Sequence, residues 1–146
     1  MVQDVLIRLT VGVEAHTHEF ISTAHEDQKF GLSMAADPET GVSPAAAAVA
    51  AALENPGIRL LGLHCHIGSQ IFEPEGFELA AKRLLGFLAD IKAAHGVELP
   101  ELDLGGGYGI AYTEADTPRP PAEIAQAMAA VVGSTCTELG LAVPRI

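Results

Sequence analysis

A run of glycines is the first feature of this sequence that could do chemistry. The segment 102–109 begins with alternating apolar residues and then places glycine at 105, 106, 107 and 109. This pattern indicates a buried strand that ends where the backbone must approach another group closely. Because glycine has no Cβ, consecutive N–H groups can converge on an anion, and phosphate is the anion most often bound in this way. For this stretch alone, a tight turn after the strand is the alternative interpretation.

A second stretch of the same kind lies earlier in the chain. In the segment 61–70, an apolar run leads into His64, Cys65 and His66, followed by Gly68 and Ser69. The Ser69 hydroxyl follows a turn glycine and suits a phosphate ligand. His64 and His66 alternate with Cys65 and so share one face of the expected strand. Two strands that end in ligand-type residues predict one site built from several strand ends.

The elements that position these residues alternate between strands and helices. We expect strands at 5–10, 29–33, 58–66 and 99–104, and the start of another at 142–146. A first helix begins at Ser43-Pro44, an N-cap followed by proline at the first helical position. A second covers the region from Phe77 to the stop at Gly96, and a third runs from Pro120-Pro121 to Gly140. The third helix is expected to turn a face containing Ile124, Met128, Val132 and Leu139 inward.

This alternation predicts an α/β fold with a parallel sheet and helical crossovers. Its repeat fits a doubly wound sheet or part of a (β/α)8 barrel. No linker divides the chain. Because the sequence ends inside an expected buried strand, we predict that residues 1–146 form an incomplete domain.

Composition limits the classes of partner. The 146 residues are 49% hydrophobic and 18% charged, which allows a packed core, and the formal net charge is −11. Such a charge argues against nucleic acid and anionic membrane surfaces as partners. The chain lacks a recognisable signal peptide or membrane span, and its two cysteines have no motif spacing. We expect a cytoplasmic protein with free thiols that binds a small molecule.

Two chemistries compete for the strand-end residues. In one, His64 and His66 bind a metal ion, with His16 and His18 adding ligands, as in a metal-dependent hydrolase. That interpretation leaves the glycine run without a role, and no obvious carboxylate follows a strand to complete the set of metal ligands. In the other, the glycines and Ser69 hold a cofactor phosphate while an imidazole packs against the cofactor ring.

Several motifs, taken together and in order, resemble a known family. They are Arg8-Leu9-Thr10 with Gly12, His16-Thr17-His18, Ile21-Ser22-Thr23, Lys29-Phe30-Gly31, the segment 64–70 and the segment 102–107. This set resembles the diaminopimelate decarboxylases, which are pyridoxal-phosphate-dependent enzymes of the alanine-racemase-like barrel fold. The resemblance extends from about Val5 to the last residue. It implies roughly the middle half of a (β/α)8 barrel.

The resemblance also implies residue roles. His66 would stack on the pyridine ring of pyridoxal 5′-phosphate, and Ser69 would bind its phosphate. Gly107, and next Gly106, would bind the phosphate through the backbone. No catalytic role is implied for Lys29, which lies near the active site or the subunit interface in members of the family.

The departures from the family concern what is missing. The Schiff-base lysine belongs before residue 1, and the glutamate that pairs with the pyridine nitrogen belongs after Ile146, as does a second, β-rich domain. Lys82 and Lys92 are expected on the outward face of a crossover helix and cannot replace the lysine. We therefore assign no catalytic residue and no metal ligand to this chain.

The function that the resemblance implies is decarboxylation of meso-2,6-diaminopimelate to L-lysine by a longer, homodimeric parent enzyme, with this chain inactive alone. Ornithine, arginine and carboxynorspermidine decarboxylases are the nearest alternatives. A non-catalytic barrel that binds pyridoxal phosphate and the metal-dependent hydrolase are alternatives of other classes.

Overall fold

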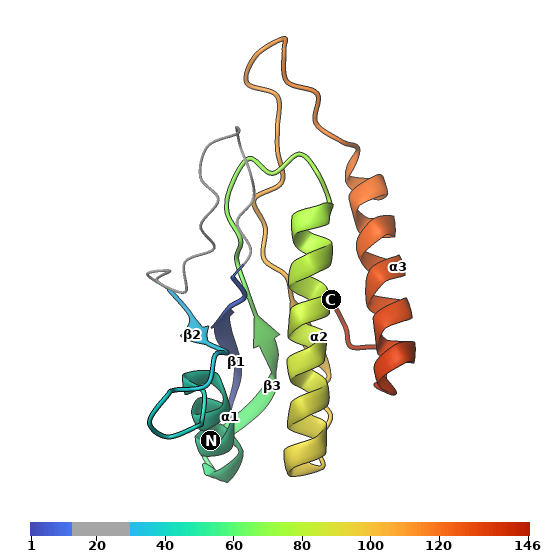
Figure 1. The fold of residues 1–146 in the computed structure, drawn as a ribbon. Coiled ribbons are helices and arrows are strands. Elements are labelled where there is room, and N and C mark those ends of the chain that lie inside the picture. The colour runs from blue at the N-terminus through green and yellow to red at the C-terminus, as the bar shows by residue number, and fades with distance from the viewer. Residues whose placement is uncertain (13–29) are drawn as a thin grey trace.

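The computed structural model describes residues 1–12 and 30–146. In chain order the elements are β1 (Gln3–Thr10), β2 (Leu32–Ser33), α1 (Pro44–Glu54), β3 (Ile58–His64), α2 (Glu75–His95), β4 (Glu101–Asp103) and α3 (Pro121–Leu139). The histidine pair at 16 and 18, considered as metal ligands, and Lys29 lie outside the described residues. Strands and helices alternate as the sequence predicted (Figure 1).

The four strands form one parallel sheet in the order β2-β1-β3-β4. Beyond β4, Arg145 forms an isolated parallel bridge with Glu101, so the expected strand start at 142–146 does pair with the sheet. The α/β class and the parallel sheet are thus confirmed. With parallel strands, all carboxyl ends lie at one edge of the sheet, where the histidines and glycines follow β3 and β4.

Local sequence signals explain where the helices begin and end. The Ser43 hydroxyl accepts a hydrogen bond from the Ala46 N–H at 3.1 Å and caps α1, whose first residue is proline. Gly96 and Gly140 adopt the left-handed conformation that ends α2 and α3 (φ 68° and 66°). The helix boundaries that the sequence predicted are therefore confirmed within two residues.

The core lies between the sheet and the helices. Leu63 of β3, Leu102 of β4 and Phe77 and Leu84 of α2 belong to one buried apolar cluster, and each is at most 1% exposed. Burying a side chain of this size contributes about 1.5–3 kcal/mol. Helices α2 and α3 lie side by side (Figure 1), which accounts for the buried face of α3.

The predicted bounds of three strands and the predicted burial of one residue need correction. Of the expected strand at 29–33, the described residues form only β2 (Leu32–Ser33). β3 ends at His64 and β4 covers only Glu101–Asp103, because the backbone beyond each strand turns into the loops that carry the ligand-type residues. Leu139 is 41% exposed, so its place on the inner face of α3 was wrong. Thr135 and Cys136 are buried there instead.

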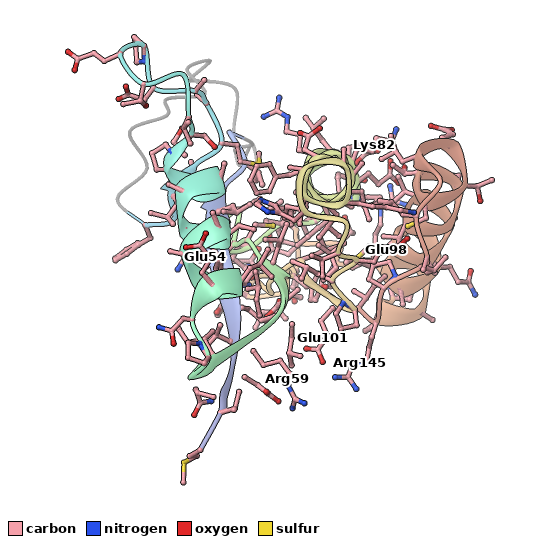
Figure 2. All side chains as sticks on the ribbon, turned by 90° about the horizontal axis from the view of Figure 1, so that it is seen from below. Glu54, Arg59, Lys82, Glu98, Glu101 and Arg145 are labelled. Carbon is pink, nitrogen blue, oxygen red and sulfur yellow. The ribbon has the colours of Figure 1, made fainter. Side chains whose placement is uncertain are left out.

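The charged side chains labelled in Figure 2 lie at the amino end of the sheet and on the outer helix surfaces. Arg145 pairs with Glu101 there, and Arg59 of β3 pairs with Asp4 of β1 at 2.6 Å. Lys82 is exposed on α2, as the sequence predicted. Within the described part of the chain, no helix is long and apolar enough to cross a bilayer.

Candidate functional site

The site consists of two loops that follow neighbouring strands: the β3 loop (residues 65–74) and the glycine loop (residues 104–110). Both lie beyond the carboxyl edge of the sheet, where Figure 1 shows the segments after β3 and β4 side by side. Backbone pairing continues past the strands, since the Cys65 N–H donates to the Asp103 carbonyl at 2.9 Å. The two strand ends thus lie side by side, as the sequence analysis expected, while their forming one binding site stays a prediction.

Gly107 brings the two loops into direct contact. Its φ is +98°, and a Cβ at this position would lie 1.9 Å from the Gly68 carbonyl oxygen and 3.2 Å from the Ser69 Cα. Only glycine allows this approach. Nearby, the Ile71 N–H donates to the Gly107 carbonyl at 2.9 Å, and the Gly109 N–H donates to the Ile71 carbonyl at 2.8 Å. Ser69 and the glycines therefore meet at one place.

His66 lies against the same turn. A Cβ on Gly105 would lie 3.2 Å from His66 Nδ1 and 2.5 Å from the Cys65 carbonyl oxygen. The φ of Gly105 is +75°, so a side chain there would be strained as well as crowded. The four predicted site residues, His66, Ser69, Gly106 and Gly107, are thus close together.

Several hydrogen-bond donors of the site have no acceptor among the described residues. Gly106 differs from its neighbours because a Cβ built on it would meet no atom within 4 Å. The N–H groups of Gly106 and Gly107 and the Ser69 hydroxyl donate to no other residue among those described. Converging backbone N–H groups and a hydroxyl are the donors that bind a phosphate monoester in proteins. The residues present fit such a group.

Asp103 fixes the start of the glycine loop, a role that the sequence analysis did not assign. Its Oδ1 accepts a hydrogen bond from the Gly105 N–H at 2.8 Å. Its Oδ2 lies 3.2 Å from His64 Nδ1, in the neighbouring strand and in register. The geometry is not that of a hydrogen bond, so the buried Nδ1 has no such partner within the described residues. The Asp-x-Gly spacing, typical of a side chain that caps a turn, was the available signal.

Cys65 is enclosed in the same region, where burial disfavours the thiolate form of its side chain. Its side chain is fully buried, and its Sγ donates to the Leu104 carbonyl oxygen at 3.9 Å. Burial, and secondarily the charge of Asp103, raises the pKa of the thiol to about 12. Both cysteines are free and buried, which confirms the expectation of free thiols.

The metal interpretation finds no support in residues 1–12 and 30–146. No three His, Cys, Asp or Glu side chains in these ranges gather closely enough to hold an ion. His64 and His66 have different neighbours, since His64 lies beside Asp103 while His66 lies against Gly105. His16 and His18 lie outside the described residues.

Comparison with known proteins identifies the family. Residues 2–146 match the family described as pyridoxal-dependent decarboxylase, pyridoxal binding domain. The chain belongs to this family. Diaminopimelate decarboxylase from Mycobacterium tuberculosis (strain ATCC 25618 / H37Rv) is 53% identical over 150 residues, which cover 100% of this chain and 32% of that protein. The enzyme from Corynebacterium efficiens is 52% identical over 145 residues, covering 99% and 30%.

Solved structures of diaminopimelate decarboxylases are also similar to this chain. Diaminopimelate decarboxylase from M. jannaschii, in complex with L-lysine, superposes with a TM-score of 0.78 at 29% identity, covering 99% of this chain and 31% of that one. The Helicobacter pylori enzyme, also with L-lysine, gives a TM-score of 0.68 at 26% identity, covering 91% and 31%. The chain thus spans about a third of the length of the relatives that it matches.

Proposed function

We propose that this chain forms the phosphate- and ring-binding side of a pyridoxal 5′-phosphate site in a longer diaminopimelate decarboxylase. The observation that carries the proposal is the contact of Gly107 with Gly68 and Ser69, which joins two loops whose N–H and hydroxyl donors point to no other described residue. Membership of the pyridoxal-binding family and the relatives with this activity support it.

In this proposal the chain binds and orients the cofactor. Ser69 Oγ and the N–H groups of Gly106 and Gly107 bind the phosphate, and His66 stacks on the pyridine ring. Backbone donors suit a chain whose net charge is −11, because they supply local positive potential without a cation. The bound cofactor supplies a ring that takes up the electron pair left when the substrate loses CO₂.

The reacting groups are proposed to lie outside this chain. Lys82 is exposed on α2, and Lys92 near the end of that helix donates to the Gly140 carbonyl at 2.8 Å. Neither lysine of the described residues is placed to anchor the cofactor. We propose that residues 1–146 are part of a (β/α)8 barrel that other segments complete. From β1 through β3 and β4 to Arg145, neighbouring segments follow the sequence order, as in a barrel, and this supports the proposal. The two-residue β2 departs from that order, because it lies on the other side of β1.

The proposed reaction of the longer enzyme converts meso-2,6-diaminopimelate to L-lysine. The L-lysine complexes of the M. jannaschii and H. pylori enzymes support this choice of product. The proposal keeps the expectation of a cytoplasmic homodimer. No observation favours an ornithine, arginine or carboxynorspermidine substrate over this one.

Binding to the 146-residue chain tests the proposal. Pyridoxine 5′-phosphate is the suitable probe, because it has the ring and phosphate of the cofactor but no aldehyde to react with surface lysines. We expect it to bind more tightly than pyridoxine, and Ser69→Ala to remove most of that difference. Equal affinity for the two probes would contradict the proposal. With pyridoxal 5′-phosphate and meso-2,6-diaminopimelate the chain is expected to form no lysine, and lysine formation would contradict the division of residues between segments.

A further inference from the structure

Gln70 has an unusual backbone conformation at the centre of the site. Its φ is +58°, and it is the only residue other than glycine in the described ranges with a positive φ. A side chain makes this left-handed region costly, and glycine is its usual occupant. A glutamine held there indicates that its side chain does something a glycine could not do.

The side chain of Gln70 fastens the β3 loop to the glycine loop. Its Nε2 donates to the Ile110 carbonyl at 3.0 Å, and its Oε1 accepts from the Ile110 N–H at 3.1 Å. The amide thus satisfies both backbone groups of one residue, as a neighbouring strand would. We call this pair of bonds the Gln70 clamp.

The Gln70 clamp extends the contacts that already join the loops. Next to it, Ile71 exchanges backbone hydrogen bonds with Gly107 and Gly109, and Gly107 packs on Gly68. Ser69 directly precedes Gln70, and Ile71, which follows it, is hydrogen-bonded to the glycine loop, so the left-handed conformation at 70 fixes where Ser69 lies relative to that loop. The clamp and the turn together fix the spacing between donors contributed by two separate loops.

We propose that Gln70 is a positioning residue for phosphate binding, holding the Ser69 hydroxyl and the glycine N–H groups at the separation that a phosphate monoester requires. This inference rests on the proposed function and deepens it. Gln70 itself does not contact the ligand. It acts through pre-organisation, since a loop already held in its binding geometry loses less entropy when the ligand arrives.

Two variants separate the clamp from the backbone conformation. Gln70→Gly removes the side chain and also relieves the backbone strain. Gln70→Asn keeps an amide and a residue type that tolerates positive φ, but it is one methylene too short to reach Ile110. Gln3→Asn is the matched control, because Gln3 lies at the amino end of β1, the opposite end of the parallel sheet.

The measurement is the dissociation constant of pyridoxine 5′-phosphate and of pyridoxine for each chain. Loss of the clamp is expected to weaken phosphate-ester binding about tenfold in both Gln70 variants, as two exposed hydrogen bonds would allow. Affinity for pyridoxine should stay unchanged, and Gln3→Asn should match the wild type. Amide hydrogen exchange at Ile110 should become faster in both Gln70 variants, which shows directly that the clamp has opened.

The outcomes distinguish this inference from the function on which it rests. If the wild-type chain prefers the phosphate ester and both Gln70 variants keep that preference, the positioning role is wrong and the proposed function stands. Equal loss of affinity for both probes would also overturn it, because it would show general loosening of the loops. A wild-type chain with no preference for the phosphate ester would overturn the proposed function and this inference together.

Discussion

Replacing Gly107 by alanine should break the contact between the two loops. The added methyl group would lie 1.9 Å from the Gly68 carbonyl oxygen, far inside van der Waals contact, and the backbone φ of +98° disfavours any side chain. The conformational strain costs about 1–3 kcal/mol, and forcing an atom into a packed contact costs about 1–3 kcal/mol more. We therefore expect Gly107→Ala to lower the free energy of unfolding by about 2–6 kcal/mol, a large part of the stability of an ordinary domain.

Gly106→Ala is the matched control for that prediction. A methyl group at Gly106 meets no atom within 4 Å, and the residue does not have a positive φ. Its effect on unfolding should therefore stay within about 0.5 kcal/mol, as for an ordinary surface substitution. If the open side of Gly106 receives the phosphate, the same methyl group should nevertheless weaken binding of pyridoxine 5′-phosphate.

Urea unfolding followed by circular dichroism measures both variants, with hydrogen exchange at the Ile71 N–H as a local readout, because this group donates to the Gly107 carbonyl. The expected pattern is a lower midpoint and faster Ile71 exchange for Gly107→Ala alone. A Gly107→Ala chain as stable as the wild type would refute the steric argument. Equal destabilisation by the two variants would refute the distinction between a packed and an open glycine.

Three further predictions concern other described residues. Cys65 should resist iodoacetamide at pH 8 in the folded chain and react in urea, because burial raises the pKa of its thiol to about 12. Mass spectrometry measures the modification, and a modified Cys65 in the folded chain would contradict this prediction. Ser43→Ala should lower the free energy of unfolding by about 1 kcal/mol through loss of the α1 cap, and an unchanged urea midpoint would count against that cap. The N–H groups of Thr40 and Glu39 donate to the Asp37 carboxylate and lower its pKa below the ordinary value of 3.8. The ionised carboxylate therefore contributes to stability above pH 3.8, and this contribution is lost as the pH falls through the lowered pKa. Carbon-detected NMR titration should show this lowered pKa, and Asp37→Asn should flatten the acid limb of the stability profile.

Local sequence signals predicted the elements well because their physical causes are local. Ser43 followed by proline starts a helix, and Gly96 and Gly140 end helices through conformations that need no distant partner. Leu139 was placed wrongly because it lies at the last turn of α3, where the partner that would cover a helix face depends on tertiary packing.

The candidate site was only partly predictable. Residue types at the strand ends indicated Ser69 and the glycine run, and the resemblance to the decarboxylase family singled out His66, Gly106 and Gly107. The structure places these residues close together. Their cofactor roles stay predictions. The sequence analysis did not identify the Gln70 clamp, because it depends on the geometry of two loops that residue type alone does not specify. It also did not identify the contact of Asp103 with Gly105, although the Asp-x-Gly spacing was a signal for it. The backbone conformation at Gln70 is visible only in the folded chain.

The most direct test of the central claim is an NMR titration of the isotope-labelled chain with pyridoxine 5′-phosphate. The account predicts that the amide resonances of Ser69, Gly106 and Gly107 shift together with one saturating dissociation constant, and that pyridoxine shifts them much less. Absence of shifts at these three amides, or shifts of the same size with pyridoxine, would contradict the claim that the joined loops form a phosphate site.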